Sequence, residues 1–306
     1  MVLSAILPFR LLSRIIKHAI LILMNTSADT NPFDFSAQTV LYGRSPSYDP
    51  TWNLRLEEAL LRNVRSYPVF LLWRNQRTVV IGKNQIAENE VDLRYASSQG
   101  IQVVRRSTGG GAVYHDLGNI NYTMITDLPE DGGFSLRELA GPVLLALRRM
   151  GLPAAFNDRN DIMINGMKVC GTAARLDGNR ILSHGCICYN VDLDIMDCVL
   201  TPSQSKMARH GIRSVHSRVV PLSVYFPGVS TSQFMNLLEA GILSQMQRVL
   251  PLNDAAGDLD SLVKTVPPVK CIRPKSMLDS IFDRESDENN DLHRRQSGLR
   301  ASGTAL

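Results

Sequence analysis

Three consecutive glycines, Gly109, Gly110 and Gly111, stand directly after a Ser-Thr pair that two arginines precede. Because glycine has no Cβ atom, a ligand can approach this backbone closely, and successive N–H groups can point at an anion. Two arginines at the end of a predicted strand favour phosphate as that anion. The spacing is not that of a Walker loop, because no Gly-Lys-Ser/Thr follows, nor that of the dinucleotide fingerprint, because Tyr114 takes the last glycine's place. A plain hairpin turn is the alternative.

Three residues with metal-binding side chains alternate along a second predicted strand, His184, Cys186 and Cys188, and would share one of its faces. A zinc site is conceivable, but it needs a fourth ligand and wider cysteine spacing, so core packing is the favoured interpretation. The pair His115-Asp116 could serve as an acid and a base. An aspartate at the junction of a strand and a turn more often stabilises the turn, and we interpret His115 as structural.

Alternating helix and strand patterns surround these candidate residues. Residues 53–65 have the apolar spacing of a helix, and residues 90–98 are predicted to form a second one, which a glycine ends. The short apolar runs 69–73 and 78–81 suggest a hairpin, and residues 101–104 form a strand that leads to the two arginines.

Further along, Ser135-Leu-Arg-Glu138 is a capping box that begins a helix running to residue 150. Asn165-Gly166 and Asp177-Gly178 each separate two strand-like runs, as expected for tight hairpin turns. Hairpins outnumber strand–helix–strand crossovers, so an α+β fold with a mixed, largely antiparallel sheet packed with helices is predicted. We expect residues 29–50 to be a loop, residues 51–250 to be one catalytic domain, and residues 251–306 to be an irregular, disordered tail.

Composition excludes several classes of protein. The chain has 306 residues, of which 44% are hydrophobic and 20% charged, as in ordinary globular proteins rather than collagenous, disordered or polytopic membrane proteins. The net charge of +4 first suggests nucleic-acid binding. Most of that excess lies in residues 1–28, so no nucleic-acid partner is predicted. The five cysteines are an odd number without the dense spacing of a disulfide scaffold, which favours a reducing compartment.

The first 28 residues contain Arg10, Arg14 and Lys17 but no acidic residue, with apolar residues interleaved at helical spacing. Such composition is typical of a transit peptide, and it predicts a location in the mitochondrial matrix. A secretory signal and a plain amphipathic first helix are the alternatives. The apolar stretch is too short to span a bilayer, so no membrane span is predicted.

The stretch from Arg105 to Asn119 resembles the pattern Arg-Arg-x-Ser/Thr-Gly-Gly-Gly-Ala/Thr-Val-Tyr/Phe-His-Asp-x-Gly-Asn of the lipoate-protein ligase and mitochondrial lipoyltransferase family. Further segments match the family in the same order: residues 53–58, 71–75, 79–82, 159–162, 168–173, 183–185 and 211–219. The fold that this resemblance implies is the one shared with biotin protein ligases, a mixed sheet with helices on one side.

The resemblance also implies a site. Lys168 matches the family's single essential lysine, a compact cation suited to charge that develops on an acyl oxygen and a phosphate. An exposed strand lysine is the alternative for Lys168, as is a salt-bridged strand end for Arg106. The residues that match contacts to the bound acyl-adenylate are Arg106, Gly109, Gly110, Gly111, Ala112, Val113, Tyr114, Arg159, Ser217 and Val219.

Several positions depart from the family pattern, and one of them is Cys186, which stands where threonine is usual. The family's Gln-Asn-Pro segment reads Gln85-Ile86-Ala87 here, and Cys170 stands where serine or glycine is usual. Related octanoyl and lipoyl transferases use a cysteine nucleophile, so Cys170 is a candidate acyl-thioester site. Because a buried cysteine is usually inert, we do not favour that role.

The function implied is transfer of a lipoyl or octanoyl group from lipoyl-AMP to a lysine of lipoyl domains. Those carriers are the E2 subunits of 2-oxoacid dehydrogenases and the glycine cleavage H protein. One alternative is a full lipoate-protein ligase that uses ATP and Mg, although the polar sequence after residue 250 does not resemble the family's C-terminal accessory domain. A second alternative is an inactive module that binds lipoyl-adenylate or a lipoyl domain. A biotin ligase is disfavoured, because the Gly-Arg-Gly-Arg loop is absent.

Overall fold

The computed structural model describes residues 35–129, 133, 135–201 and 219–274. The predicted transit peptide and Ser217 therefore lie outside the described residues.

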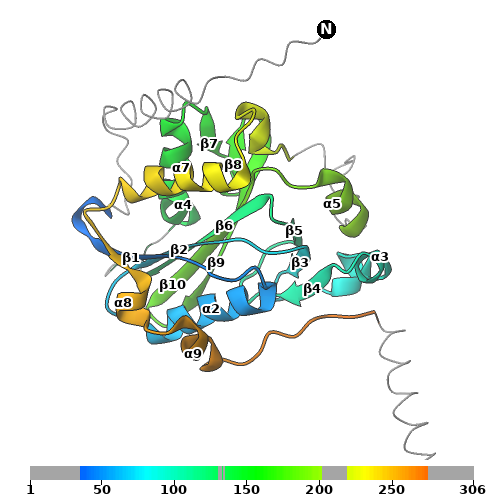
Figure 1. Ribbon diagram of the computed structural model, residues 1–306, viewed down its shortest axis with the longest axis horizontal. Coiled ribbons are helices and arrows are strands. Elements are labelled where there is room, and N and C mark those ends of the chain that lie inside the picture. Colours follow the sequence, from blue (N-terminus) through cyan, green and yellow to red (C-terminus); the bar gives the residue numbers. More distant parts are fainter. Residues whose placement is uncertain (1–34, 130–132, 134, 202–218, 275–306) are drawn as a thin grey trace, which may run out of the picture.

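A large mixed sheet runs through the centre of the molecule (Figure 1). Its strand order is β11-β1-β2-β6-β10-β9-β8-β7, with β1 parallel to both β2 and β11 and every other pair antiparallel. The strands are β1 (Thr39–Arg44), β2 (Val69–Trp73), β6 (Asn119–Asp127), β7 (Ala154–Phe156), β8 (Ile162–Ile164), β9 (Met167–Asp177), β10 (Arg180–Cys188) and β11 (Arg248–Pro251). The predicted α+β class and the largely antiparallel sheet are confirmed.

Helices cover both faces of this sheet (Figure 1). On one face α4 and α7 pack over Phe70, Tyr122 and Met124, and on the other α2 packs over Leu71 and Leu182. The implied arrangement with helices on one side of the sheet is wrong. The central strands carry apolar side chains on both faces of the sheet, and helices bury each face. The helices are α2 (Pro50–Asn63), α3 (Leu93–Ser98), α4 (Leu136–Arg149), α5 (Leu193–Val199), α7 (Thr231–Leu243), α8 (Leu252–Ala256) and α9 (Leu259–Lys264), with 3₁₀ turns at Phe35–Ala37, Ala87–Asn89 and Leu222–Tyr225.

A second sheet of three strands carries the glycine-rich loop. Its order is β4-β3-β5, formed by Gln102–Arg105, Thr78–Ile81 and Val113–His115. The predicted hairpin between residues 69–73 and 78–81 is wrong, although both strands exist. Strand β2 pairs with β6 in the large sheet, whereas β3 pairs with β4 and β5, so the chain changes sheets between them.

Local turn and cap chemistry is realised as the residue types predict. The Ser135 side chain accepts backbone N–H bonds from the first turn of α4, and the Glu138 carboxylate accepts the N–H of Ser135 in return. Asn165 and Gly166 both adopt positive φ in the turn between β8 and β9. The turn between β9 and β10 is shifted by one residue, because Asp177 pairs with Arg180 and leaves Gly178-Asn179 as the loop.

Two segments predicted to be irregular are ordered. Strand β1 lies within residues 29–50, which were expected to be a loop, and α8 and α9 lie within the expected tail. The apolar side chains Val40 and Leu41 of β1, and Leu252 and Val263 of the two helices, are buried in the core. These elements are too short to show a clear period, so tertiary burial decides their structure. Residues 275–306 lie outside the described part of the chain.

Candidate functional site

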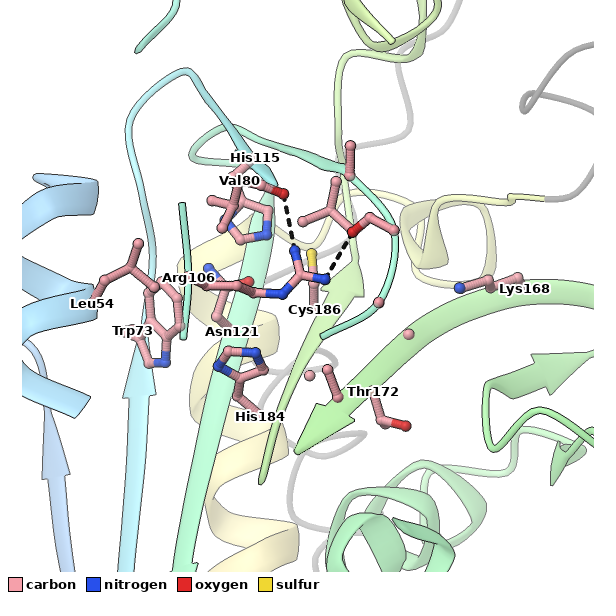
Figure 2. Close-up of a pocket in the computed structure, with 17 residues that line it drawn as sticks. Leu54, Trp73, Val80, Arg106, His115, Asn121, Lys168, Thr172, His184 and Cys186 are labelled. Carbon is pink, nitrogen blue, oxygen red and sulfur yellow. Dashed lines mark hydrogen bonds between the residues drawn. The ribbon is translucent and has the colours of Figure 1, made fainter. Parts of the chain in front are cut away.

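A cavity lies where the glycine-rich loop of the small sheet covers the middle strands of the large one (Figure 2). The space between its walls is about 630 Å³ when its open mouth is included. Its walls come from α2, from both sheets and from the glycine loop. The lining residues include Leu54, Trp73, Arg106, Gly110, Gly111, His115, Asn121, Lys168, Gly171, His184 and Cys186.

Arg106 holds the glycine loop in place. Its guanidinium is buried and donates hydrogen bonds to the carbonyl oxygens of Gly109 (2.6 Å), Gly111 (2.8 Å) and Val80 (3.0 Å). Burial lowers the pKa of Arg106 to about 10, which the nearby Glu57 carboxylate partly opposes, so the side chain is charged at neutral pH. Arg106 thus shapes the loop through direct bonds and places a positive charge in the cavity wall.

The loop also depends on a glycine of the neighbouring strand end. A Cβ atom on Gly82 would lie 2.2 Å from the carbonyl oxygen of Gly110, a backbone atom that has no rotamer with which to move away. Gly110 itself adopts a φ of 90°, a conformation that side chains rarely tolerate. By contrast, a Cβ on Gly109 would meet no atom within 4 Å. The close crossing of Gly82 and Gly110 is therefore a requirement for the loop's position.

A buried chain of polar groups runs beneath the loop. The Arg106 Nε donates to the Thr108 hydroxyl, which is 2.9 Å from His184 Nε2. The other ring nitrogen of His184 lies 2.9 Å from a carboxylate oxygen of Glu57, which also accepts the Thr123 hydroxyl. Buried polar groups in low dielectric are stabilising only when each finds its partner, so this chain fixes Arg106 and His184 together.

Lys168 reaches the cavity from β9 on the side opposite Leu54 and Trp73 (Figure 2). Its ammonium lies 2.9 Å from a carboxylate oxygen of Asp161, and its side chain is 35% exposed. A Cβ on Gly171 would lie 2.9 Å from the ammonium, so glycine leaves the room that this side chain occupies. The Lys168 backbone pairs with Val219 and accepts the N–H of Val220. The cation can thus face an anion in the cavity.

The cysteines of the predicted strands lie in different surroundings. Cys170 is fully buried in the apolar core, and burial raises the pKa of its thiol far above the ordinary value, which leaves little thiolate for nucleophilic attack. His184 and Cys186 share the cavity face of β10 as predicted, but they line the cavity rather than pack in the core. Within the described residues, no group of three or more His, Cys, Asp or Glu side chains is placed to hold a metal ion.

His115 and Asp116 have separate environments. Asp116 accepts the N–H groups of Gly118 and Asp192, so it stabilises the turn as predicted. His115 is buried, lines the cavity and lies 3.1 Å from the Asn75 amide nitrogen. Burial, with Arg106 and His184 nearby, lowers the pKa of His115 to about 3, so its ring is neutral at physiological pH.

We expect His115 to make the protein less stable in acid. In the unfolded chain a histidine binds a proton below a pH of about 6.5, whereas folded His115 does so only near 3. Between these two pH values the unfolded chain binds a proton that the folded chain does not. The free energy of unfolding therefore falls as the pH drops from 6.5 toward 3, by up to about 1.4 kcal/mol per pH unit. Urea unfolding between pH 7 and 4 should show a shallower loss for His115→Gln, and parallel curves would contradict this assignment.

A comparison with protein-family models matches residues 49–243 to the lipoyl protein ligase A/B catalytic domain. The chain belongs to this family. The match covers α2 through α7, the elements that form both sheets' central strands and the cavity.

Individual members of the family show how much of each protein is shared. The chain is 37% identical over 186 residues to lipoate-protein ligase LplJ of Bacillus subtilis, which is 60% of this chain and 56% of that protein. Across the first curated relatives it matches, the chain spans between 54% and 62% of their length.

Solved structures of family members have the same fold. A bi-partite lipoate protein ligase from Thermoplasma acidophilum, described with its E2 lipoyl domain, superposes with a TM-score of 0.59 at 29% identity and covers 74% of this chain and 90% of its own. A lipoate-protein ligase A bound with ATP gives a TM-score of 0.59 at 28% identity, covering 74% and 93% of the two chains.

The residues that the family resemblance suggested fall into three groups. Arg106, Lys168 and the loop from Gly110 to Val113 line the cavity together. The Tyr114 side chain is instead buried in the core of the small sheet, and Val219 packs at the edge of the same cluster. Gly109 and Arg159 are not among the lining residues; Arg159 is exposed in the loop between β7 and β8.

Sequence reasoning missed the buried hydrogen-bonded chain at this family member's site. Glu57, Thr108 and His184 form the buried chain, although their segments were all matched to the family. The available signal was a carboxylate at an apolar-face position of the helix at residues 53–65, where a buried acid needs a partner.

None of the helices in the described residues is long and apolar enough to cross a membrane.

Proposed function

We propose that this chain holds lipoyl-AMP and transfers its lipoyl or octanoyl group to a lysine of a lipoyl domain. The observation that carries this proposal is the division of one cavity into two ends. Lys168 and the glycine loop stand at one end, and Leu54 and Trp73 stand at the other. Such a cavity suits an acyl chain joined to a phosphate, and a member of a lipoyl ligase family is expected to bind one.

The chemistry requires a cation more than a nucleophile. The amine nitrogen of the carrier lysine bonds to the acyl carbon, the bond from that carbon to the phosphate oxygen breaks, and AMP leaves with the electron pair while the amine releases a proton. Negative charge grows on the carbonyl oxygen and then on the phosphate. Lys168, held on a rigid strand, would stabilise both without reorganising, and loop N–H groups would add dipoles.

The first alternative is a full lipoate-protein ligase, which makes the adenylate itself from lipoate and ATP with Mg. The names of the relatives favour it, as does the structure of a lipoate-protein ligase A bound with ATP. The loop is equally suited to the phosphates of ATP. We keep transfer from lipoyl-AMP as the main proposal, because the cation of Lys168 and the apolar side chains of Leu54 and Trp73 line one cavity.

The second alternative is a module that binds lipoyl-adenylate or a lipoyl domain without catalysis. The position of Lys168 at the cavity argues against it, since a degenerate site would have no need of a cation there. For the carrier, an E2 lipoyl domain is favoured by the Thermoplasma ligase, whose structure is described with its own E2 lipoyl domain. The glycine cleavage H protein is the other candidate carrier.

One experiment separates the three readings. Purified protein and an apo lipoyl domain are incubated either with lipoate and Mg-ATP or with preformed lipoyl-AMP, and the mass of the carrier is measured. We expect the carrier mass to rise with lipoyl-AMP. A rise with both donors identifies a ligase, and no rise with either, while the protein binds the adenylate, identifies the binding module.

We expect the Gly82→Ala variant to lose most of this transfer. Its new methyl group would push the Gly110 carbonyl away, and a displacement of about 1 Å at a catalytic group can cost about a hundredfold in rate. The matched control is Lys83→Ala, which shortens the exposed side chain next to Gly82 and should retain the wild-type rate. Equal rates for the two variants would show that the crossing of Gly82 and Gly110 does not position the loop.

We also propose that the protein acts in the mitochondrial matrix. This proposal rests on residues 1–28 alone, which carry basic and apolar residues at helical spacing and no acidic residue. A fluorescent reporter fused to these residues should colocalise with a matrix marker in cells. A reporter that stays in the cytosol would rule out the targeting role of this segment.

A further inference from the structure

Next to Leu54, the cavity wall is formed by side chains of three neighbouring strands, Trp73, Asn121 and Cys186, which we call the cavity floor. Trp73, Asn121 and Cys186 lie directly opposite one another on β2, β6 and β10, so their side chains share the face that lines the cavity. In Figure 2, Asn121 lies between Trp73 and Cys186. A chain that runs from Lys168 toward Leu54 must therefore pass over the Asn121 amide.

Asn121 is buried without a partner. Its side chain is 1% exposed, and neither its amide nitrogen nor its amide oxygen makes a hydrogen bond to the described residues. Nearly all buried polar groups in folded proteins are satisfied, so an amide with both ends free, facing a cavity, indicates a ligand that completes it.

His115 presents a second unpartnered donor to the same cavity. The Asn53 amide nitrogen donates to two backbone carbonyls and to the Asn75 side-chain oxygen, which fixes the orientation of both amides. The Asn75 amide nitrogen then donates to His115 Nδ1, so the neutral ring carries its proton on Nε2. That N–H is buried and has no acceptor among the described residues.

We infer that Asn121, assisted by His115, is a specificity-determining residue that discriminates against saturated hydrocarbon chains in favour of acyl chains carrying sulfur. This inference rests on the proposed function. It assigns the choice between lipoyl and octanoyl donors to two side chains of the cavity floor.

The physical reason is the cost of leaving buried donors unpaired. An octanoyl chain has only C–H groups along its length, so it would leave the buried Asn121 and His115 N–H groups without acceptors. The two sulfur atoms of the dithiolane ring are weak acceptors and polarisable, and can face these donors. An unsatisfied buried polar group costs enough to lower affinity by about tenfold.

The test measures binding of lipoyl and octanoyl adenylates whose phosphate is replaced by a non-reactive sulfamoyl linkage, using calorimetry. We expect wild-type protein to bind the lipoyl analogue about tenfold more tightly than the octanoyl analogue. Asn121→Leu, which keeps the branched shape and removes the amide, should lower this ratio markedly, because only the His115 N–H group then remains to discriminate. Asn121→Ala serves as a second variant if leucine disturbs packing, and thermal unfolding verifies that each variant is folded.

The control is Tyr122→Phe, which removes a buried polar atom from the opposite face of the same strand and should keep the wild-type ratio. Equal affinities for the two analogues in the wild-type protein, or an unchanged ratio in both Asn121 variants, would overturn the inference and leave the proposed transfer intact. Failure of the wild-type protein to bind either analogue would overturn the inference and the proposed function together.

Discussion

The Lys168→Met variant should transfer the acyl group about 10²- to 10³-fold more slowly than the wild-type protein, because a fixed charge at a developing oxyanion contributes on that scale. Methionine keeps much of the length of the side chain and its apolar stem while it removes the charge. The loss should appear in kcat, measured from the carrier's mass over time at saturating lipoyl-AMP.

The folded state should barely change in this variant. The pair between Lys168 and Asp161 is about one-third exposed on the lysine side, and such partly solvated pairs contribute about 0–1 kcal/mol. The matched control is Lys264→Met, which removes an exposed lysine of α9 that does not line the cavity, and it should keep the wild-type rate. A normal rate in Lys168→Met would remove this residue from the mechanism.

The Arg106→Met variant should lose both stability and transfer. Three carbonyl oxygens around the loop would lose their donor, and the Glu57 carboxylate would lose a nearby positive charge. Removal of one partner from a buried charged network typically lowers the free energy of unfolding by about 3–5 kcal/mol, a large fraction of a domain's stability. The expected result is a urea midpoint far below that of the wild type and a rate too low to measure.

Arg106→Lys separates charge from geometry. Lysine keeps the positive charge but has a single nitrogen, which cannot hold Gly109, Gly111 and Val80 at once. We expect this variant to retain part of the stability and little of the rate. Arg62→Met, which removes an exposed arginine from α2, is the control and should change the free energy of unfolding by less than about 1 kcal/mol. Wild-type stability in both Arg106 variants would contradict the role of this residue in shaping the loop.

Local sequence signals predicted the elements better than their pairing. The capping box at Ser135 and the Asn165-Gly166 turn each depend on a few adjacent residues, and the structure has both. The partners of β2 and β3 could not be read in the same way, because an apolar run of four or five residues fits any sheet edge. A short connection between two strands predicts a hairpin, but here burial on both faces of β2 places it in the centre of the larger sheet.

The candidate site was predictable only where its residues belong to local sequence motifs. Gly110, Gly111 and Lys168 belong to contiguous motifs, and the structure brings them to one cavity. The pairing of Glu57 with His184 joins residues 127 positions apart, and only the folded sheet places them together. The polar floor at Asn121 was equally invisible, because an asparagine in a strand signals nothing until its neighbours are known.

The most direct test of the central claim is a single-turnover measurement of carrier mass. The folded protein, in slight excess over lipoyl-AMP, is mixed with an apo lipoyl domain, and a second sample contains the same domain with its acceptor lysine changed to arginine. We predict that the first carrier gains the mass of one lipoyl group and that the arginine carrier gains none. A folded protein that binds the adenylate but leaves the first carrier unchanged would contradict the proposal that this cavity transfers the acyl group.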